Sequence, residues 1–132
     1  MQSQSNPLLV LSAGVYLLAG VAALFAPQEL LSLGGAVSTP LTASLLQMVG
    51  AAFLGFGVLN WSSRHSLVGG IYSRPLVVAN FGHTFAGAAL LVKAVPRGPG
   101  STLAWVALGI YCLLALLFGW KLFGSGPKSK PA

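Results

Sequence analysis

The amino-terminal half of this chain is almost free of charge. Its first 63 residues contain a single charged side chain, Glu29, which separates two uncharged stretches of more than 25 residues each. About 20 consecutive apolar residues in a helix are enough to cross the hydrocarbon of a bilayer. Both stretches therefore predict membrane-spanning helices.

The composition of the whole chain agrees with a membrane location. Of the 132 residues, 55% are hydrophobic and only 6% are charged, whereas about a quarter of the residues in a soluble domain are charged. Each span uses about 20 residues, and unpaired backbone cannot lie in lipid. We therefore expect an all-α fold, an integral membrane four-helix bundle with antiparallel up-down topology.

Prolines and polar clusters set the expected limits of the spans. A single transmembrane domain is predicted over residues 8–123, after an N-terminal segment, 1–7, and before a disordered basic tail, 124–132. The four spans are expected at residues 8–26, 41–61, 75–95 and 102–123. In the first connection, Glu29-Leu30-Leu31 is predicted to form a short turn of helix at the membrane interface.

The basic residues predict the orientation. Two of them, Lys93 and Arg97, lie on one side of the predicted bundle, and the other five lie with the termini: Arg64, Arg74, Lys121, Lys128 and Lys130. The positive-inside rule then places both termini in the cytoplasm of a multi-pass inner (plasma) membrane protein. Arg64, Arg74 and Trp61 are interpreted as headgroup or topology contacts. Membrane lipids are expected partners and nucleic acid is not, because no basic patch is interleaved with aromatic residues.

The residue types that carry out most enzyme chemistry are scarce. The sequence contains no Asp, one Glu in a predicted loop, and a lone Cys112. Paired-carboxylate catalysis, carboxylate-bound metals and zinc clusters therefore have no suitable side chains. We expect no catalytic residue, no metal and no obligatory cofactor.

One predicted helix carries a polar face. The polar side chains inside the first three spans are Ser12, Tyr16, Gln47, Asn60, Asn80, His83 and Thr84; the fourth span shows no comparable face. Asn80, His83, Thr84 and Gly87 lie at offsets of 0, 3, 4 and 7 and share one side of the third helix. We expect Tyr16, Gln47 or Asn80 to approach His83 near the midplane.

Two interpretations of this face remain open. The side chains can act as hydrogen-bonding links between helices, or His83, Asn80, Tyr16, Gln47 and Thr84 can line a pocket for a lipophilic ligand, a quinone or a lipid. The first interpretation fits a non-enzymatic accessory or scaffold component, which works within a larger membrane complex or a homo-oligomer. The second fits a binding module. A transporter or channel is less favoured, since no span has a polar stripe along its full length.

The whole pattern resembles the DoxX-like superfamily of small four-helix bacterial membrane proteins. The resemblance covers about residues 8–123 and rests on Ala26-Pro-Gln-Glu-Leu-Leu31, on the segment Leu46 to Trp61, and on Gly70-Ile-Tyr-Ser-Arg-Pro75 followed by Asn80 and His83. It implies the bundle architecture. Some relatives are associated with thiosulfate or quinone redox chemistry and others assist assembly or surface-protein export. No catalytic residue carries over, because the acidic and paired-cysteine features that a redox member would need are missing here.

Overall fold

The computed structural model describes residues 5–66 and 73–124, and the regular secondary structure in this part of the chain is entirely helical. The elements are α1 (Pro7–Phe25), α2 (Pro27–Leu33), α3 (Pro40–Ser62), α4 (Ser73–Ala94), the 3₁₀ helix η1 (Val95–Arg97) and α5 (Thr102–Gly124). The predicted all-α class is confirmed. The predicted basic tail and most of the predicted N-terminal segment lie outside the described residues.

Four of these helices, α1, α3, α4 and α5, are long and apolar enough to cross a membrane. Their ends differ by at most two residues from the predicted span limits. The connection after the first span contains α2, a helix of seven residues, so the short turn expected at Glu29-Leu30-Leu31 is part of a somewhat longer helix.

Local signals in the sequence explain where the helices begin. At the start of α1, Asn6 Oδ1 accepts a hydrogen bond from Leu8 N at 3.1 Å. At the start of α3, the Thr39 and Thr42 side chains each accept from the other residue's backbone N–H, at 3.1 and 2.8 Å. Such caps satisfy N–H groups that have no partner within the helix. Proline follows each cap at the first helical position, where its missing N–H has no cost.

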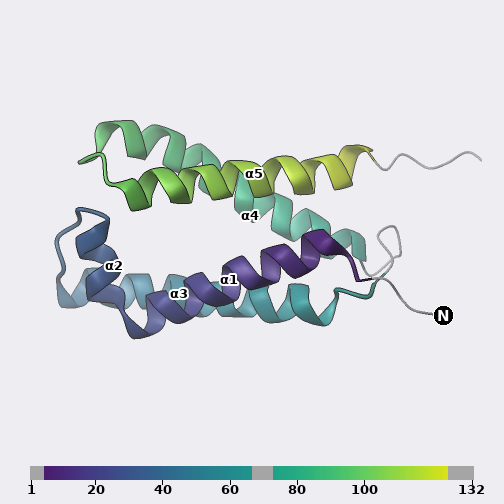
Figure 1. Cartoon of the computed structure of the whole chain (residues 1–132), viewed down its shortest axis with the longest axis horizontal. Coiled ribbons are helices and arrows are strands. Elements are labelled where there is room, and N and C mark those ends of the chain that lie inside the picture. The colour runs from purple at the N-terminus through teal and green to yellow at the C-terminus, as the bar shows by residue number, and fades with distance from the viewer. Residues whose placement is uncertain (1–4, 67–72, 125–132) are drawn as a thin grey trace, which may run out of the picture.

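The long helices form two pairs, α1 with α3 and α4 with α5 (Figure 1). Asn6 N donates to Arg64 O at 2.7 Å, and Gln47 Nε2 donates to Leu24 O at 3.0 Å. The beginning of α1 therefore lies beside the end of α3, and the end of α1 lies near the beginning of α3. The start of α1 and the end of α5 are at the same end of the molecule, on the right in Figure 1.

Glycines let α1 and α3 approach closely. A Cβ atom on Gly20 would lie 2.9 Å from Gly50 O, and one on Gly50 would lie 2.9 Å from Ala23 Cβ. About two turns further along α3, a Cβ on Gly57 would lie 2.7 Å from Leu17 Cγ. Cβ atoms almost never lie this close to another heavy atom, so a side chain at any of these positions would force its neighbours to shift. The close backbone packing of the first pair therefore depends on glycine at these positions.

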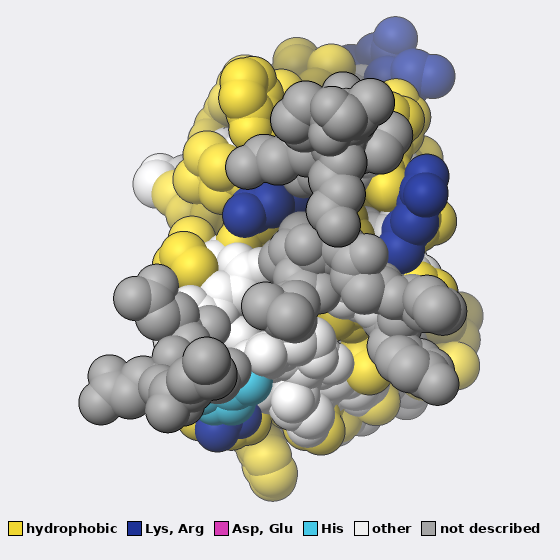
Figure 2. Space-filling view, turned by 90° about the vertical axis from the view of Figure 1, so that its right-hand side faces the viewer, with side chains coloured by type: hydrophobic (Ala, Val, Ile, Leu, Met, Phe, Trp, Pro, Cys, Tyr) yellow, Lys and Arg dark blue, Asp and Glu magenta, His cyan; other side chains and the backbone are white. Residues whose placement is uncertain are grey.

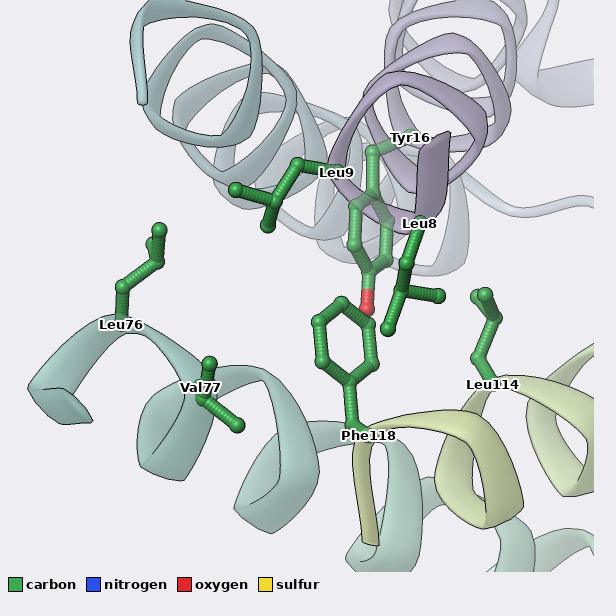
Figure 3. Close-up of a cluster of buried hydrophobic side chains, with 7 residues drawn as sticks. All are labelled: Leu8, Leu9, Tyr16, Leu76, Val77, Leu114 and Phe118. Atoms are coloured by element: carbon green, nitrogen blue, oxygen red, sulfur yellow. The ribbon is translucent and has the colours of Figure 1, made fainter. Parts of the chain in front are cut away.

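Larger side chains fill the space between the two pairs (Figure 3). The buried cluster consists of Leu8, Leu9 and Tyr16 from α1, Leu76 and Val77 from α4, and Leu114 and Phe118 from α5. Phe118 is fully buried and Tyr16 is only 2% exposed. The close contacts of these side chains stabilise the association of the two pairs through van der Waals packing.

Replacing Gly50 by leucine is expected to push α1 and α3 apart and to lower the free energy of unfolding by about 1–3 kcal/mol, the usual cost of overpacking. Gly55→Leu is the matched control, because a Cβ on Gly55 meets nothing within 4 Å and both changes have the same effect on helix propensity. Unfolding by SDS titration in mixed micelles, followed by circular dichroism, measures both. Equal free energies for the two variants would contradict this account of the interface.

Candidate functional site

Two buried asparagines connect the helix pairs. Asn60 of α3 and Asn80 of α4 exchange two hydrogen bonds, each with an Nδ2 to Oδ1 distance of 2.8 Å. Asn60 Nδ2 also donates to Ser12 Oγ of α1 at 3.0 Å, and Asn80 Nδ2 donates to Leu76 O at 2.9 Å. All three side chains are completely buried. Three helices are thus joined by one polar network.

This network leaves no amide hydrogen free. Each amide nitrogen has two hydrogens, and each has two acceptors here. Ser12 Oγ donates to Leu9 O at 3.2 Å, and Thr84 Oγ1 donates to Asn80 O at 2.7 Å within its own helix. Asn80 and Thr84 are therefore occupied within the protein, and the structure does not place them as free donors toward a ligand.

His83 occupies a different position on α4, although it lies only three residues from Asn80. Successive residues turn by about 100° around a helix, so His83 is rotated about 60° from Asn80 and lies at the edge of the predicted polar face. Asn80 and Thr84 point inward and are fully buried, whereas His83 is only partly buried. The face predicted as one unit therefore divides into a buried part and a partly exposed edge.

Aromatic rings surround the His83 imidazole. It stacks on Phe56 with ring centroids 4.8 Å apart, and its edge meets Phe53 at 5.7 Å. Tyr16 and Tyr111 lie at 5.7 and 5.6 Å. The predicted proximity of Tyr16 and His83 is present in the structure. We call these five residues, Tyr16, Phe53, Phe56, His83 and Tyr111, the aromatic cluster.

Tyr111 brings a polar group from the fourth span, in which the sequence showed no polar face, to the histidine. The distance between Tyr111 Oη of α5 and His83 Nε2 is 3.2 Å, a hydrogen bond whose direction depends on the histidine tautomer. Gly87 makes room for this contact, because a Cβ there would overlap the Tyr111 ring at Cε1. The glycine one turn after the histidine was visible in the sequence, but the ring that occupies its space was not.

Tyr16 brings a hydroxyl group into an apolar setting. Its side chain is 2% exposed, and its Oη finds no hydrogen-bond partner among the described residues. Figure 3 shows the hydroxyl between the helix pairs, pointing toward the Phe118 ring. A buried hydroxyl without a partner costs roughly 1–3 kcal/mol. Such a group calls for an explanation, since most buried polar atoms are paired.

Gln47, which the sequence grouped with His83, makes its hydrogen bond to α1. Its side chain donates to Leu24 O, near the end of α1. The carbonyls of the last helical turn have no partner within the helix. Gln47 therefore closes the α1–α3 contact at the end of the molecule opposite to Asn6.

The predicted headgroup contacts lie at the ends of helices. Arg64 Nη1 donates to Trp61 O at 2.7 Å, and its guanidinium carbon lies 4.3 Å from the centroid of the Trp61 ring. Arg74 is exposed in the first turn of α4. Figure 2 shows the end of the molecule where α1 begins, with several Lys and Arg side chains and no acidic side chain in view.

Within residues 5–66 and 73–124, no three side chains of His, Cys, Asp or Glu gather in a way that could hold a metal ion. Comparisons of the chain with family profiles, with curated proteins and with solved structures give no match. The similarity to the DoxX-like superfamily therefore remains a prediction from the sequence.

Replacing one asparagine of the pair is expected to lower the free energy of unfolding by more than the net stabilisation that the paired hydrogen bonds provide. Asn80→Leu leaves the buried Asn60 amide without its main partner, at a cost of about 1–3 kcal/mol. The double variant Asn60→Leu/Asn80→Leu removes both amides and should be destabilised by less than the sum of the single changes. The free energy of unfolding in micelles gives the coupling, which averages about 0.6 kcal/mol for hydrogen bonds in membranes.

A second double-mutant cycle, with Gln47 in place of Asn60, provides the control for this measurement. Gln47 donates to Leu24 O and to neither asparagine, so Gln47→Leu and Asn80→Leu should be additive. If Asn60→Leu and Asn80→Leu were equally additive, the two amides would not act as a unit.

Proposed function

We propose that this protein is a multi-pass protein of the inner membrane that acts without catalysis, as an accessory or scaffold component. The observation that carries the proposal is the closed Asn60–Asn80–Ser12 network, in which the most buried polar side chains hold the helix pairs together. Side chains committed in this way keep the bundle in one arrangement. They have no remaining donor with which to act on a substrate.

The outer surface supports insertion of the four long helices in lipid. Large apolar side chains are exposed on each of them, among them Leu18 on α1, Met48 on α3, Leu90 on α4 and Leu116 on α5, at 69–76%. Such surfaces on all sides suit contact with hydrocarbon rather than water. In this proposal the four helices cross the membrane in alternating directions, as an antiparallel up-down bundle.

The charges support the proposed orientation, with both termini in the cytoplasm. Arg64, Arg74 and Lys121 lie at the ends of α3, α4 and α5 that share one side of the bundle, and Lys93 and Arg97 lie at the other end of the α4–α5 pair. Basic residues favour the cytoplasmic side. With its guanidinium over Trp61, Arg64 is suited to the headgroup region, where both an aromatic ring and a cation are favourable.

The proposed partners are membrane lipids and either a larger membrane complex or further copies of the chain. The bundle has an apolar exterior, and its described part includes no domain outside the four helices and their connections. Its contribution to a complex would then be made through helix faces within the bilayer. The DoxX-like resemblance agrees with such a role, since some members of that group assist assembly.

Reporter fusions test the orientation. Green fluorescent protein joined after Gly124 should fluoresce, and alkaline phosphatase inserted at Gly98, between η1 and α5, should be active, because the first folds in the cytoplasm and the second needs the opposite side. The reverse pattern in bacterial cells would contradict the proposed orientation. If each reporter were placed at each of the two positions and none of the four fusions were active, insertion as a stable bundle would be contradicted.

Isolation from native membranes tests the scaffold role. The tagged protein, extracted in a mild detergent at its natural level, should be recovered with a membrane partner or a further copy in a fixed ratio. Deletion of the gene should then reduce the amount of that assembled complex, as measured by native gel electrophoresis. Recovery only as a lone monomer, with no complex diminished by the deletion, would argue against the proposal.

A further inference from the structure

The cations at one end of the bundle have no acidic side chain to pair with. Arg64, Arg74 and Lys121 lie at the end where α1 begins, and Figure 2 shows no acidic side chain on this end. The sequence contains no Asp and a single Glu, Glu29. Glu29 belongs to α2, which lies at the opposite end, beside the connection between α4 and α5 (Figure 1). No side chain of this protein therefore neutralises the basic end.

Arg64 is the cation that the structure holds in place. Its Nη1 donates to Trp61 O at 2.7 Å, and its guanidinium carbon lies over the Trp61 ring, 4.3 Å from the centroid. Its backbone oxygen accepts a hydrogen bond from Asn6 N, which ties the residue to the start of α1. A guanidinium that is already oriented loses little further conformational freedom when it binds an anion. Arg64 is therefore preorganised for binding, whereas the exposed Arg74 has no such contact among the described residues.

The Arg64 side chain retains hydrogen-bonding capacity. A guanidinium carries several N–H groups in a planar fork, and the contact with Trp61 O is the one hydrogen bond of this side chain within residues 5–66 and 73–124. Pairs of such N–H groups match two oxygens of a phosphate group. Because the side chain is partly exposed, a phosphate can approach it from outside the protein.

The position of Arg64 indicates where that phosphate comes from. Arg64 is the second residue after α3, which ends at Ser62, and the neighbouring Trp61 is 48% exposed. Tryptophan is favoured at the interface between membrane and water, and basic residues next to a span attract anionic lipids. If α3 crosses the membrane, as proposed above, the guanidinium lies at the level of the phospholipid headgroups.

The lack of carboxylates also discriminates between headgroups. A zwitterionic headgroup carries an ammonium next to its phosphate, and the other charged side chains at this end of the described chain, Arg74 and Lys121, are cations that repel it. We propose that Arg64 and Trp61 form a binding site for the phosphodiester headgroup of an anionic phospholipid, with the Arg64 N–H groups on the phosphate oxygens. This site deepens the proposed function by naming the class of lipid partner, and it rests on the proposed membrane insertion.

Arg64→Gln tests this site, because it removes the charge and keeps a polar side chain. Native mass spectrometry of the full chain in detergent, titrated with dioleoyl phosphatidylglycerol, measures the affinity. The affinity of the variant should be about fivefold lower than that of the wild type, the effect of one basic residue near a membrane surface. Dioleoyl phosphatidylethanolamine has the same acyl chains and should bind the wild type more weakly than phosphatidylglycerol does.

Three further variants separate a built site from simple attraction between charges. Lys93→Gln is the matched control, since it removes one cation from the last turn of α4, at the other end of the bundle, and should bind phosphatidylglycerol as the wild type does. Arg64→Lys and Trp61→Leu keep the net charge of the chain. Both should still weaken binding, because the first loses the planar fork and the second loses the ring under the guanidinium.

Four results would overturn the proposal: equal affinity of the wild type for the two lipids, unchanged affinity in Arg64→Gln, an equal loss in Lys93→Gln, or wild-type affinity in both Arg64→Lys and Trp61→Leu. Displacement of the bound lipid by millimolar inorganic phosphate would overturn it as well, since the site would then belong to a soluble anion. Insertion and assembly are measured by the reporter fusions and by partner recovery, not by lipid affinity, so a failure of the headgroup site is distinguishable from a failure of the proposed function.

Discussion

The exchange of hydrogen bonds between Asn60 and Asn80 sets the relation between the two halves of this bundle. In hydrocarbon, apolar surfaces have little tendency to seek one another, so helix pairs associate through close packing and through polar contacts that lipid cannot offer. The two amides satisfy each other at 2.8 Å in both directions. Because both are fully buried, rotating either helix would leave amide groups without partners. The pair therefore fixes how α4 faces α3.

Glycine determines how closely the helices can approach within each pair. Gly20 of α1 and Gly50 of α3 lie at the α1–α3 contact, where a side chain would collide with the neighbouring helix. Gly55, also on α3, faces open space. Gly87 has a different effect: because it has no side chain, the Tyr111 ring can lie against α4, and the Tyr111 hydroxyl reaches His83. Glycines thus permit both the close α1–α3 contact and the contact of Tyr111 with His83.

The polar groups of the interior fall into two classes, and the rotation of α4 separates them. Asn80 and Thr84 point into the centre and are satisfied by protein atoms, whereas His83, about 60° away, reaches the partly exposed edge among aromatic rings. Tyr16 contributes the buried hydroxyl that has no partner in the described chain. The asparagine network and the aromatic cluster therefore both include residues of α4 but share no hydrogen-bond donor.

The sequence by itself determined the helical class, the four long apolar helices and their ends to within two residues. These features follow from local causes: uncharged apolar length, caps such as Asn6 and Thr39, and prolines that stop or start helices. It also identified Asn80 and His83 as polar residues of one helix within the predicted membrane span. Only the tertiary structure decided that Asn80 pairs with Asn60, that His83 meets Tyr111, and that Gln47 lies elsewhere. Partners of this kind depend on the rotation and spacing of helices distant in sequence, which no local pattern contains.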